Sequence, residues 1–256
     1  MRNYFTISIV LFFLVAGCKT TTKEKDASFT FIERGDYVID SYGDIVIYRN
    51  SETNKVMDGY YVVGNELSKW EEFNLKQGIL QGDYLIFHSN GEIYTHSIYS
   101  NGKLNGEEKT YFPSGKLQKL TTYKNDEPYG KTIGYYESGQ VESESTLKDG
   151  KVVESVYYDI IGTIVSQMFI REGRTIRQKI IGGKLHSEQI TSNYDNFEAM
   201  KFFNADGSLK VYLQMLTDGD NGYLIELDKD GNELKRIDMK ANPQEAMKYM
   251  EFLTQM

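Results

Sequence analysis

The chain has 256 residues and a formal net charge of −8, with 29 Lys and Arg against 37 Asp and Glu. That length fits one large domain or two small ones. The acidic balance argues against a general binder of nucleic acid, which needs clustered Lys and Arg. Gly (23) and Tyr (20) are abundant while Pro is rare (3), a composition typical of turn-rich β-structure.

Residues 1–17 predict a signal peptide. Arg2 gives a short basic start, and residues 4–15 are almost entirely apolar. This stretch is too short to cross a bilayer, which takes about 20 residues. It ends in Val15-Ala16-Gly17-Cys18, which resembles the lipobox of bacterial lipoproteins. The resemblance implies that the peptide is cut before Cys18 and that the Cys18 thiol carries the lipid; the alternatives are an ordinary signal peptide with a chance cysteine and a buried strand.

Residues 18–28 predict a flexible tether, because the stretch after the cysteine is polar, charged and free of aromatic residues. Cys18 is the only cysteine, so no disulfide is expected. Lys19, rather than Asp, follows it, and by resemblance to enteric lipoproteins this favours the outer over the inner membrane. We therefore expect a lipid-anchored protein of the bacterial cell envelope.

The strongest signal is an internal repeat. Three segments of 24 residues align without gaps from Gly82, Gly106 and Gly130. A series of turn glycines extends this repeat along the chain: Gly91, Gly115, Gly139, Gly162, Gly183, Gly207 and Gly231. Successive glycines of the series are separated by 24, 24, 23, 21, 24 and 24 residues. Gly43 lies two periods before Gly91, so about nine units would fill residues 35–240, with an irregular one between them.

Each unit predicts one β-hairpin. In the unit at Gly82, an apolar run leads into the turn Ser89-Asn90-Gly91, and a second run follows it. Apolar residues recur two and eight positions after most of the turn glycines, as in Ile93 and Tyr99, which places both columns on one face of the strand. Among the tyrosines, we expect Tyr111 and Tyr135 in the core.

The repeat pattern G-x-x-x-x-Y/F-x-x-x-G-x-L/I, followed by Y-x-N-G-K-L, resembles MORN repeats. It is closest to the bacterial variant found in proteins named as antitoxins. Residues 99–104 and 111–117 match best; the resemblance covers residues 82–175 well and the flanking units loosely. It implies an all-β fold over residues 29–241, an elongated single twisted antiparallel sheet of hairpins, and it implies no catalytic residues.

Residues 242–256 predict a short C-terminal helix. Asn242 suits the cap, Pro243 the first position and Glu245 the third. A helical stripe of apolar residues follows, namely Met247, Met250 and Leu253, with Tyr249 beside it. We expect this helix to cap the last exposed edge of the sheet. The alternative is a Met-rich binding helix.

No motif predicts a catalytic residue, a cofactor or a metal site. Gly130-Lys131-Thr132 resembles the end of a phosphate-binding loop but falls within the repeat, and Asp218–Gly222 lacks the rest of a calcium loop. His88, His96 and His186 lack metal-ligand spacing. A carboxylate pair that meets only in space stays open at this point.

We therefore expect a non-enzymatic repeat lipoprotein that binds an envelope protein through its sheet, with the membrane contacted through the lipid anchor and no nucleic acid bound. Exposed rings such as Tyr94 and Tyr136 are candidates for the binding surface, although cross-strand pairing is the simpler role for tyrosines of a sheet. The alternatives are an antitoxin-like neutraliser of a partner toxin and a module that binds cell-wall carbohydrate.

Overall fold

The computed structural model describes residues 29–253, so the predicted signal peptide, Cys18 and the tether lie outside the described residues, as do residues 254–256. The strands are β1 (Phe29–Ile32), β2 (Tyr37–Tyr42), β3 (Ile45–Asn50), β4 (Gly59–Gly64), β5 (Lys69–Lys76), β6 (Ile79–Phe87), β7 (Ile93–Ser100), β8 (Lys103–Tyr111), β9 (Leu117–Lys124), β10 (Glu127–Tyr135), β11 (Val141–Lys148), β12 (Lys151–Tyr158), β13 (Ile164–Arg171), β14 (Arg174–Ile181), β15 (Lys184–Ser192), β16 (Glu198–Phe203), β17 (Leu209–Asp218), β18 (Asn221–Leu227) and β19 (Glu233–Asp238). A 3-10 helix, η1 (Arg34–Asp36), follows β1, and an α-helix, α1 (Pro243–Leu253), follows β19.

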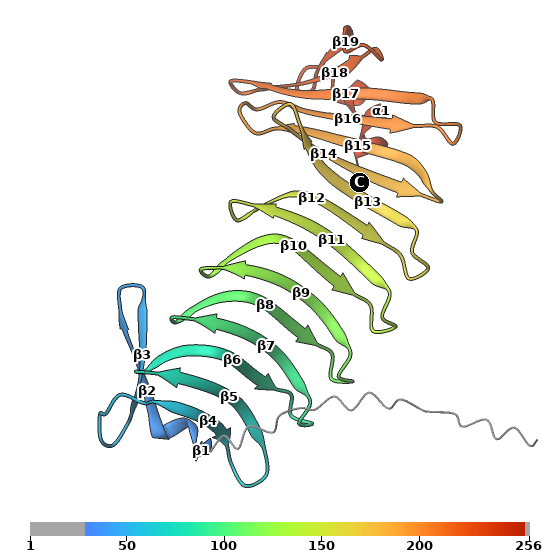
Figure 1. Cartoon of the computed structure of the whole chain (residues 1–256). Coiled ribbons are helices and arrows are strands. Elements are labelled where there is room, and N and C mark those ends of the chain that lie inside the picture. The colour runs from blue at the N-terminus through green and yellow to red at the C-terminus, as the bar shows by residue number, and fades with distance from the viewer. Residues whose placement is uncertain (1–28, 254–256) are drawn as a thin grey trace, which may run out of the picture.

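Seventeen strands form one long twisted sheet (Figure 1), which confirms the predicted all-β architecture of tandem hairpins. Strands β4 to β19 pair antiparallel with their neighbours in chain order. β1 adds to the other edge of β4 in parallel register, with Phe29 opposite Tyr60. The twist follows the right-handed preference of each strand.

Two kinds of turn alternate along the sheet. Between units, two-residue turns use left-handed residues, as at Asn101 (φ 53°) and Gly102 (φ 78°), and this twist matches that of the flanking strands. Within units the turn is longer: His88 N–H donates to Glu92 O (2.8 Å) and Gly91 N–H donates to His88 O (2.9 Å). The two-residue turns at which units begin and end therefore all lie along one margin of the sheet, and the longer turns lie along the opposite margin.

Glycine bulges explain the repeat length. Ser97 pairs with Glu108 and Tyr99 with Leu104, so β8 holds two extra residues at Gly106, which has a φ of +136°. β6 and β10 have the same two-residue excess, whereas β12 has one extra residue and β14 has none. The turn at Gly183 is also one residue shorter than the turn at Gly91. The spacing therefore falls from 24 to 23 and then to 21.

The unit expected around Gly43 does form a hairpin, β2–β3, but this hairpin is a separate two-stranded sheet and not a repeat of the main one. It lies against the main sheet at the β5–β6 turn, where Tyr48 N–H donates to Gly78 O (2.8 Å). A side chain at Gly78 would meet Ile47 and Val56 at 2.8 Å, so glycine allows this close approach. Non-local packing thus removes the hairpin from the repeat series.

Apolar cores lie at both ends of the sheet. The N-terminal core packs β2–β3 on β4–β6, with these buried residues: Ile32, Tyr48, Met57, Val63, Phe73, Leu75 and Leu80. The C-terminal core packs α1 on β16–β19, with these: Met200, Phe202, Val211, Leu213, Leu224, Ile237 and Ala246. A third cluster, which includes Tyr212 and Ile225, lies on the opposite face of the last strands.

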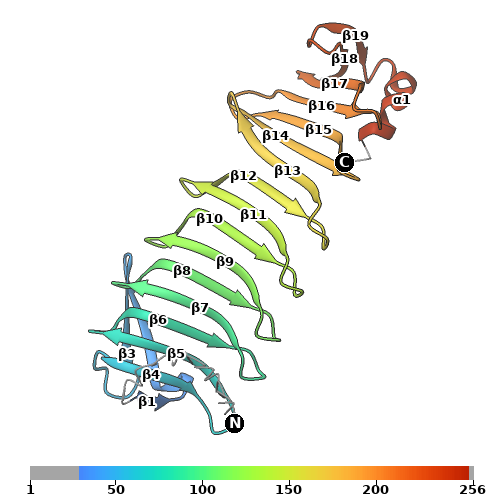
Figure 2. The ribbon, with the colours of Figure 1, turned by 45° about the vertical axis from the view of Figure 1, so that its right-hand side comes forward.

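The two elements that cover the ends of the sheet, the hairpin β2–β3 and helix α1, lie on the same face of the twisted sheet. Directly opposed residues share a face, and an unbroken row runs across the strands from Phe73 to Leu213: Phe73, Tyr84, Ser97, Glu108, Thr121, Thr132, Ser145, Ser155, Met168, Arg177, Gln189, Met200 and Leu213. We call this face the capped face and the other the uncapped face. Figure 2 shows the hairpin and α1 at opposite ends of the molecule.

Helix α1 starts at Pro243, as predicted, and Glu245 N–H donates to Asn242 O (3.1 Å). The predicted apolar stripe is wrong in its phase: Met247 is 68% exposed and Met250 is 47% exposed.

The side that packs carries Ala246, Tyr249 and Phe252, because Tyr249 O–H donates to Glu226 (2.6 Å) and thereby fixes the rotation of the helix. The helix covers a face of the sheet rather than the edge of β19. No helix within residues 29–253 combines the length and the apolar character needed to cross a bilayer.

Candidate functional site

The part of the capped face between the two covers, on β7–β15, is lined along its middle by small polar residues. One row across the strands contains Ser97, Thr121, Thr132, Ser145 and Ser155. The next row contains Thr95, Thr110, Gly134, Ser143, Ser166 and Ser187, interrupted by the larger Lys119, Tyr157 and Lys179. Larger apolar side chains flank both rows, as Ile93 and Tyr99 do on β7. The difference in side-chain size makes this stretch a shallow trough with a hydroxyl floor.

The trough floor is packed at its N-terminal part. Ser97 and Thr121 are each 4% exposed. The Ser97 hydroxyl donates to Glu108 (2.9 Å), which also approaches the tyrosines of the flanking column. Burial, with the Glu108 carboxylate adding to it, raises the pKa of Tyr99 and Tyr123, so both rings stay neutral at physiological pH. Hollows deepen the trough farther along, one of them about 440 Å³ and bordered by Thr110, Thr132 and Ser143.

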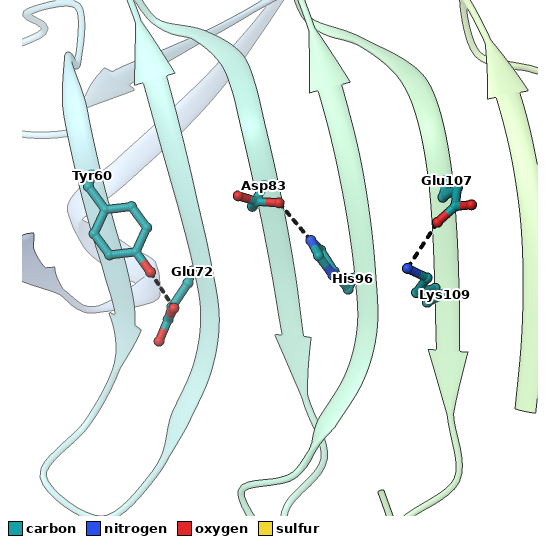
Figure 3. Close-up of polar contacts among 6 residues, drawn as sticks. All are labelled: Tyr60, Glu72, Asp83, His96, Glu107 and Lys109. Atoms are coloured by element: carbon teal, nitrogen blue, oxygen red, sulfur yellow. Dashed lines mark hydrogen bonds and ion pairs between the residues drawn. The ribbon is translucent and has the colours of Figure 1, made fainter. Parts of the chain in front are cut away.

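Charged side chains gather in pairs on the uncapped face, at its N-terminal part. Figure 3 shows three such pairs: Tyr60 with Glu72, Asp83 with His96, and Glu107 with Lys109. The Asp83 Oδ1 lies 2.7 Å from His96 Nε2, and Glu107 lies 2.9 Å from Lys109 Nζ. These contacts join neighbouring strands or neighbouring positions, as in pairs that stabilise a sheet.

The pairs also shift the ionisation of their members. Burial, followed by the hydrogen bond to Glu72, raises the pKa of Tyr60, and the Glu107 carboxylate raises the pKa of Lys109. Glu72 also accepts a bond from Lys69. Each carboxylate of Figure 3 therefore already has a hydrogen-bond or ion-pair partner within the sheet, an arrangement that suits a structural surface.

The tyrosines expected at a binding surface differ in accessibility. Tyr94 is 43% exposed, with its ring 4.9 Å from that of His88. Tyr136 is half-buried and its hydroxyl donates to the carbonyl of Tyr158 (2.7 Å). A binding role for either residue stays a prediction. Tyr111 and Tyr135 are half-buried, whereas the buried tyrosines of the described chain are Tyr48 and Tyr212.

The histidines do not converge. His88 Nε2 lies 3.0 Å from the carbonyl of Tyr111 on the next hairpin, whereas His96 contacts Asp83. Nowhere in residues 29–253 do three or more His, Cys, Asp or Glu side chains come together as metal ligands.

The other two motifs belong to the repeat. Gly130-Lys131-Thr132 lies in the bulge of β10, and Asp218 and Asn221 flank the two-residue turn between β17 and β18.

The small polar rows were missed in the sequence, although a signal for them exists. Ser97, Thr121 and Ser145 each lie six residues after a turn glycine, between the two apolar columns that the repeat predicts. A search limited to apolar columns passes over such positions. The register, which sets residues of neighbouring units side by side, turns them into one surface.

Comparison with known proteins supports the repeat assignment. The family described as MORN repeat variant matches residues 104–125 and 128–149. No curated protein matches the chain in a sequence search. A crystal structure of a protein from Lactobacillus plantarum aligns over 82% of this chain and 84% of that chain, with 15% sequence identity and a TM-score of 0.19.

Proposed function

Because residues 104–125 and 128–149 are MORN repeats, we propose that the chain is a non-enzymatic repeat protein that binds another protein across the trough. The observation that carries this proposal is the trough itself: both ends of the capped face are covered by the chain's own elements, while β7–β15 between them are left open. A hydroxyl floor with apolar flanks offers hydrogen bonds and apolar contact along an extended line, as protein interfaces require.

We also propose that the protein acts in the bacterial cell envelope. A lipid on Cys18 would attach it to a membrane, and the outer membrane is favoured over the inner one. The lipobox-like Val15-Ala16-Gly17-Cys18 supports this address. Phe29, the start of β1, lies eleven positions after Cys18, so the sheet would begin within about 40 Å of the lipid. Its partner would then be a protein of the same compartment, and neutralisation of a secreted toxin would be one form of such binding.

The binding surface is tested by photocrosslinking in native membranes, with the full lipidated chain. Val152 (41% exposed) lies at the trough, and Val165 (37% exposed) lies on the uncapped face of the neighbouring strand. A photoreactive residue at position 152 is expected to capture a specific protein, whereas the same residue at position 165 is not. Equal capture from both positions, or no capture from either, would contradict binding through the trough.

The variant Cys18→Ser tests whether the protein is attached to the membrane through a lipid on Cys18. This variant is expected to lose palmitate labelling and to leave the detergent phase on phase partition, while the thermal unfolding of the sheet stays unchanged, because Cys18 precedes β1 in the chain. Palmitate incorporation that persists without the thiol would refute lipidation at Cys18.

A further inference from the structure

The hairpin β2–β3, at the N-terminal end of the molecule (Figure 1), has one exposed apolar face. Strand alternation places Tyr37 and Tyr48 on the side of the hairpin that packs on the N-terminal core. The opposite side, which we call the outer face, carries four large apolar side chains that are each 42–59% exposed: Val38, Tyr42, Ile45 and Val56.

The four side chains of the outer face are brought together by strand pairing. Tyr42 is opposite Ile45 beside the hairpin turn. At the other end of the hairpin, Arg49 pairs with Val38 on one side and with Val56 on the other. A contiguous group of exposed apolar side chains marks an interaction surface, whereas single exposed side chains need no such explanation.

The outer face carries little net charge. Asp40 and Arg49, between the apolar side chains, form an ion pair with 2.9 Å between Oδ2 and Nε. Asp44 is the only other charged residue of the two strands and their turn, and it lies in the turn, at the tip of the hairpin. The middle of this face can therefore leave bulk water without exposing an unpaired charge to an apolar surface.

The place of the hairpin in the chain indicates what covers its outer face. Phe29, at the start of β1, lies eleven positions after Cys18, so a lipid on Cys18 would hold this end of the sheet within about 40 Å of the bilayer. A short tether raises the effective concentration of the second contact to roughly the millimolar range. Even a weak apolar contact with lipid would then be populated, an advantage that neither a free protein partner nor a second copy of the chain has.

We propose that the outer face of the hairpin rests in the head-group region of the membrane to which Cys18 attaches the chain. The proposal rests on the membrane attachment proposed above and adds a second contact to it. Tyr42 suits this depth, because its ring is apolar and its hydroxyl is polar.

The contact is shallow for two reasons. Asp44 carries its charge at the tip of the hairpin, where it must stay among water and lipid head groups. Within residues 29–253, β2 pairs with β3 alone, so the backbone groups on its other edge also need polar partners, which hydrocarbon does not offer. We therefore expect a depth of about 5–10 Å, as for other segments that lie at the boundary between head groups and acyl chains.

The probe is a fluorophore on an introduced cysteine, in the full lipidated chain reconstituted into vesicles of phosphatidylethanolamine with a minor share of phosphatidylglycerol. Cys18 is the only cysteine and would be blocked by lipid, so Ile45→Cys supplies a single reactive thiol. An environment-sensitive label at this position should shift its emission to shorter wavelength in vesicles. Nitroxide lipids that carry the spin label near the head group should quench it. Tyr42→Cys should behave in the same way.

Two matched positions serve as controls. Leu67 (93% exposed) lies at the same end of the sheet, in the longer turn between β4 and β5, on the margin opposite the β5–β6 turn that the hairpin contacts. Leu234 (64% exposed) lies on β19, at the other end of the molecule (Figure 2). Labels at Leu67→Cys and Leu234→Cys should show neither the shift nor the quenching. Circular dichroism of each variant confirms that the sheet is intact.

Three results would overturn the proposal: a label at position 45 that stays in water, equal quenching at positions 45 and 67, or a shifted but unquenched label at position 45 together with disulfide crosslinking between copies of Ile45→Cys. The last result would assign the outer face to a second copy of the chain. If the vesicles float with the protein while position 45 stays unquenched, the attachment stands and only the hairpin contact is refuted. A parent chain that takes up label at Cys18, or does not float with the vesicles, would refute the attachment itself and this contact with it.

Discussion

Phe73→Ala is expected to unfold the N-terminal end of the sheet and to leave the C-terminal end intact. Phe73 is 0% exposed, and its ring lies between 5.3 and 5.9 Å from four tyrosine rings, those of Tyr37, Tyr48, Tyr61 and Tyr84. Removal of a buried Phe side chain costs about 3–5 kcal/mol, and each aromatic pair adds about 0.5–1.5 kcal/mol beyond its buried area. We therefore expect a loss near the top of that range, about 5 kcal/mol.

The loss should stay local because the two apolar cores are separated by the single-layer strands β7–β15, and in repeat proteins each unit contacts mainly its neighbours. Hydrogen exchange followed by mass spectrometry measures this directly. Protection should fall in β2–β6 and persist in β16–β19. Phe202→Ala, at a ring that is 2% exposed in the C-terminal core, should give the reverse pattern.

Phe169→Ala is the control, because Phe169 is only half-buried in the middle of the sheet. It should change protection little at either end. The reasoning would be refuted if Phe73→Ala and Phe202→Ala lowered protection equally along the whole chain, since the sheet would then be one cooperative unit. A loss below about 1 kcal/mol for Phe73→Ala would refute the assigned packing.

Three further predictions follow from individual contacts. Gly106→Ala should lower the free energy of unfolding in denaturant by about 1–3 kcal/mol, because φ at Gly106 is +136° and the new Cβ would lie 3.2 Å from Ile98. Gly35→Ala, where the new Cβ enters open space, should change the stability little. Equal effects of the two substitutions would contradict the bulge. Phe252→Ala should lower the thermal stability of the C-terminal end by about 2 kcal/mol or more, and Met247→Ala should stay within about 0.5 kcal/mol, an order that reverses if the sequence-based stripe is right after all. The hydrogen bond to Glu226 and, second, burial raise the pKa of Tyr249 to about 12, above its ordinary value of 10.0. Since the pKa of Tyr249 is higher in the folded state, the contact between Tyr249 and Glu226 stabilises the fold fully below pH 10, and this contribution is lost as the pH rises to about 12. Solvent screening limits the contribution to about 1 kcal/mol. Exchange protection of α1 should therefore fall over this range in the parent, and a fall that is just as steep in Tyr249→Phe would exclude the assignment.

The sequence alone determined the hairpins, because their causes are local. Turn residues such as Asn101-Gly102 take left-handed conformations, and the alternation of apolar residues sets each strand. The start of α1 followed in the same way from Asn242 and Pro243. Even the uneven spacing of the turn glycines was visible, although its cause, the smaller bulge of β12 and the absence of a bulge in β14, appears only in the register.

Tertiary structure decided which surfaces are covered. The hairpin β2–β3 has the same turn chemistry as the repeats, yet contacts with Gly78 and the N-terminal core place it on a face of the sheet instead of in line. The phase of α1 depends on Glu226, a residue 23 positions away, so the local apolar stripe gave the wrong side. Ser97 and Thr121 fall in one row only because strand register sets residues of neighbouring hairpins side by side. Contacts between residues far apart in the chain are not encoded in any local pattern, and it is these contacts that create the trough.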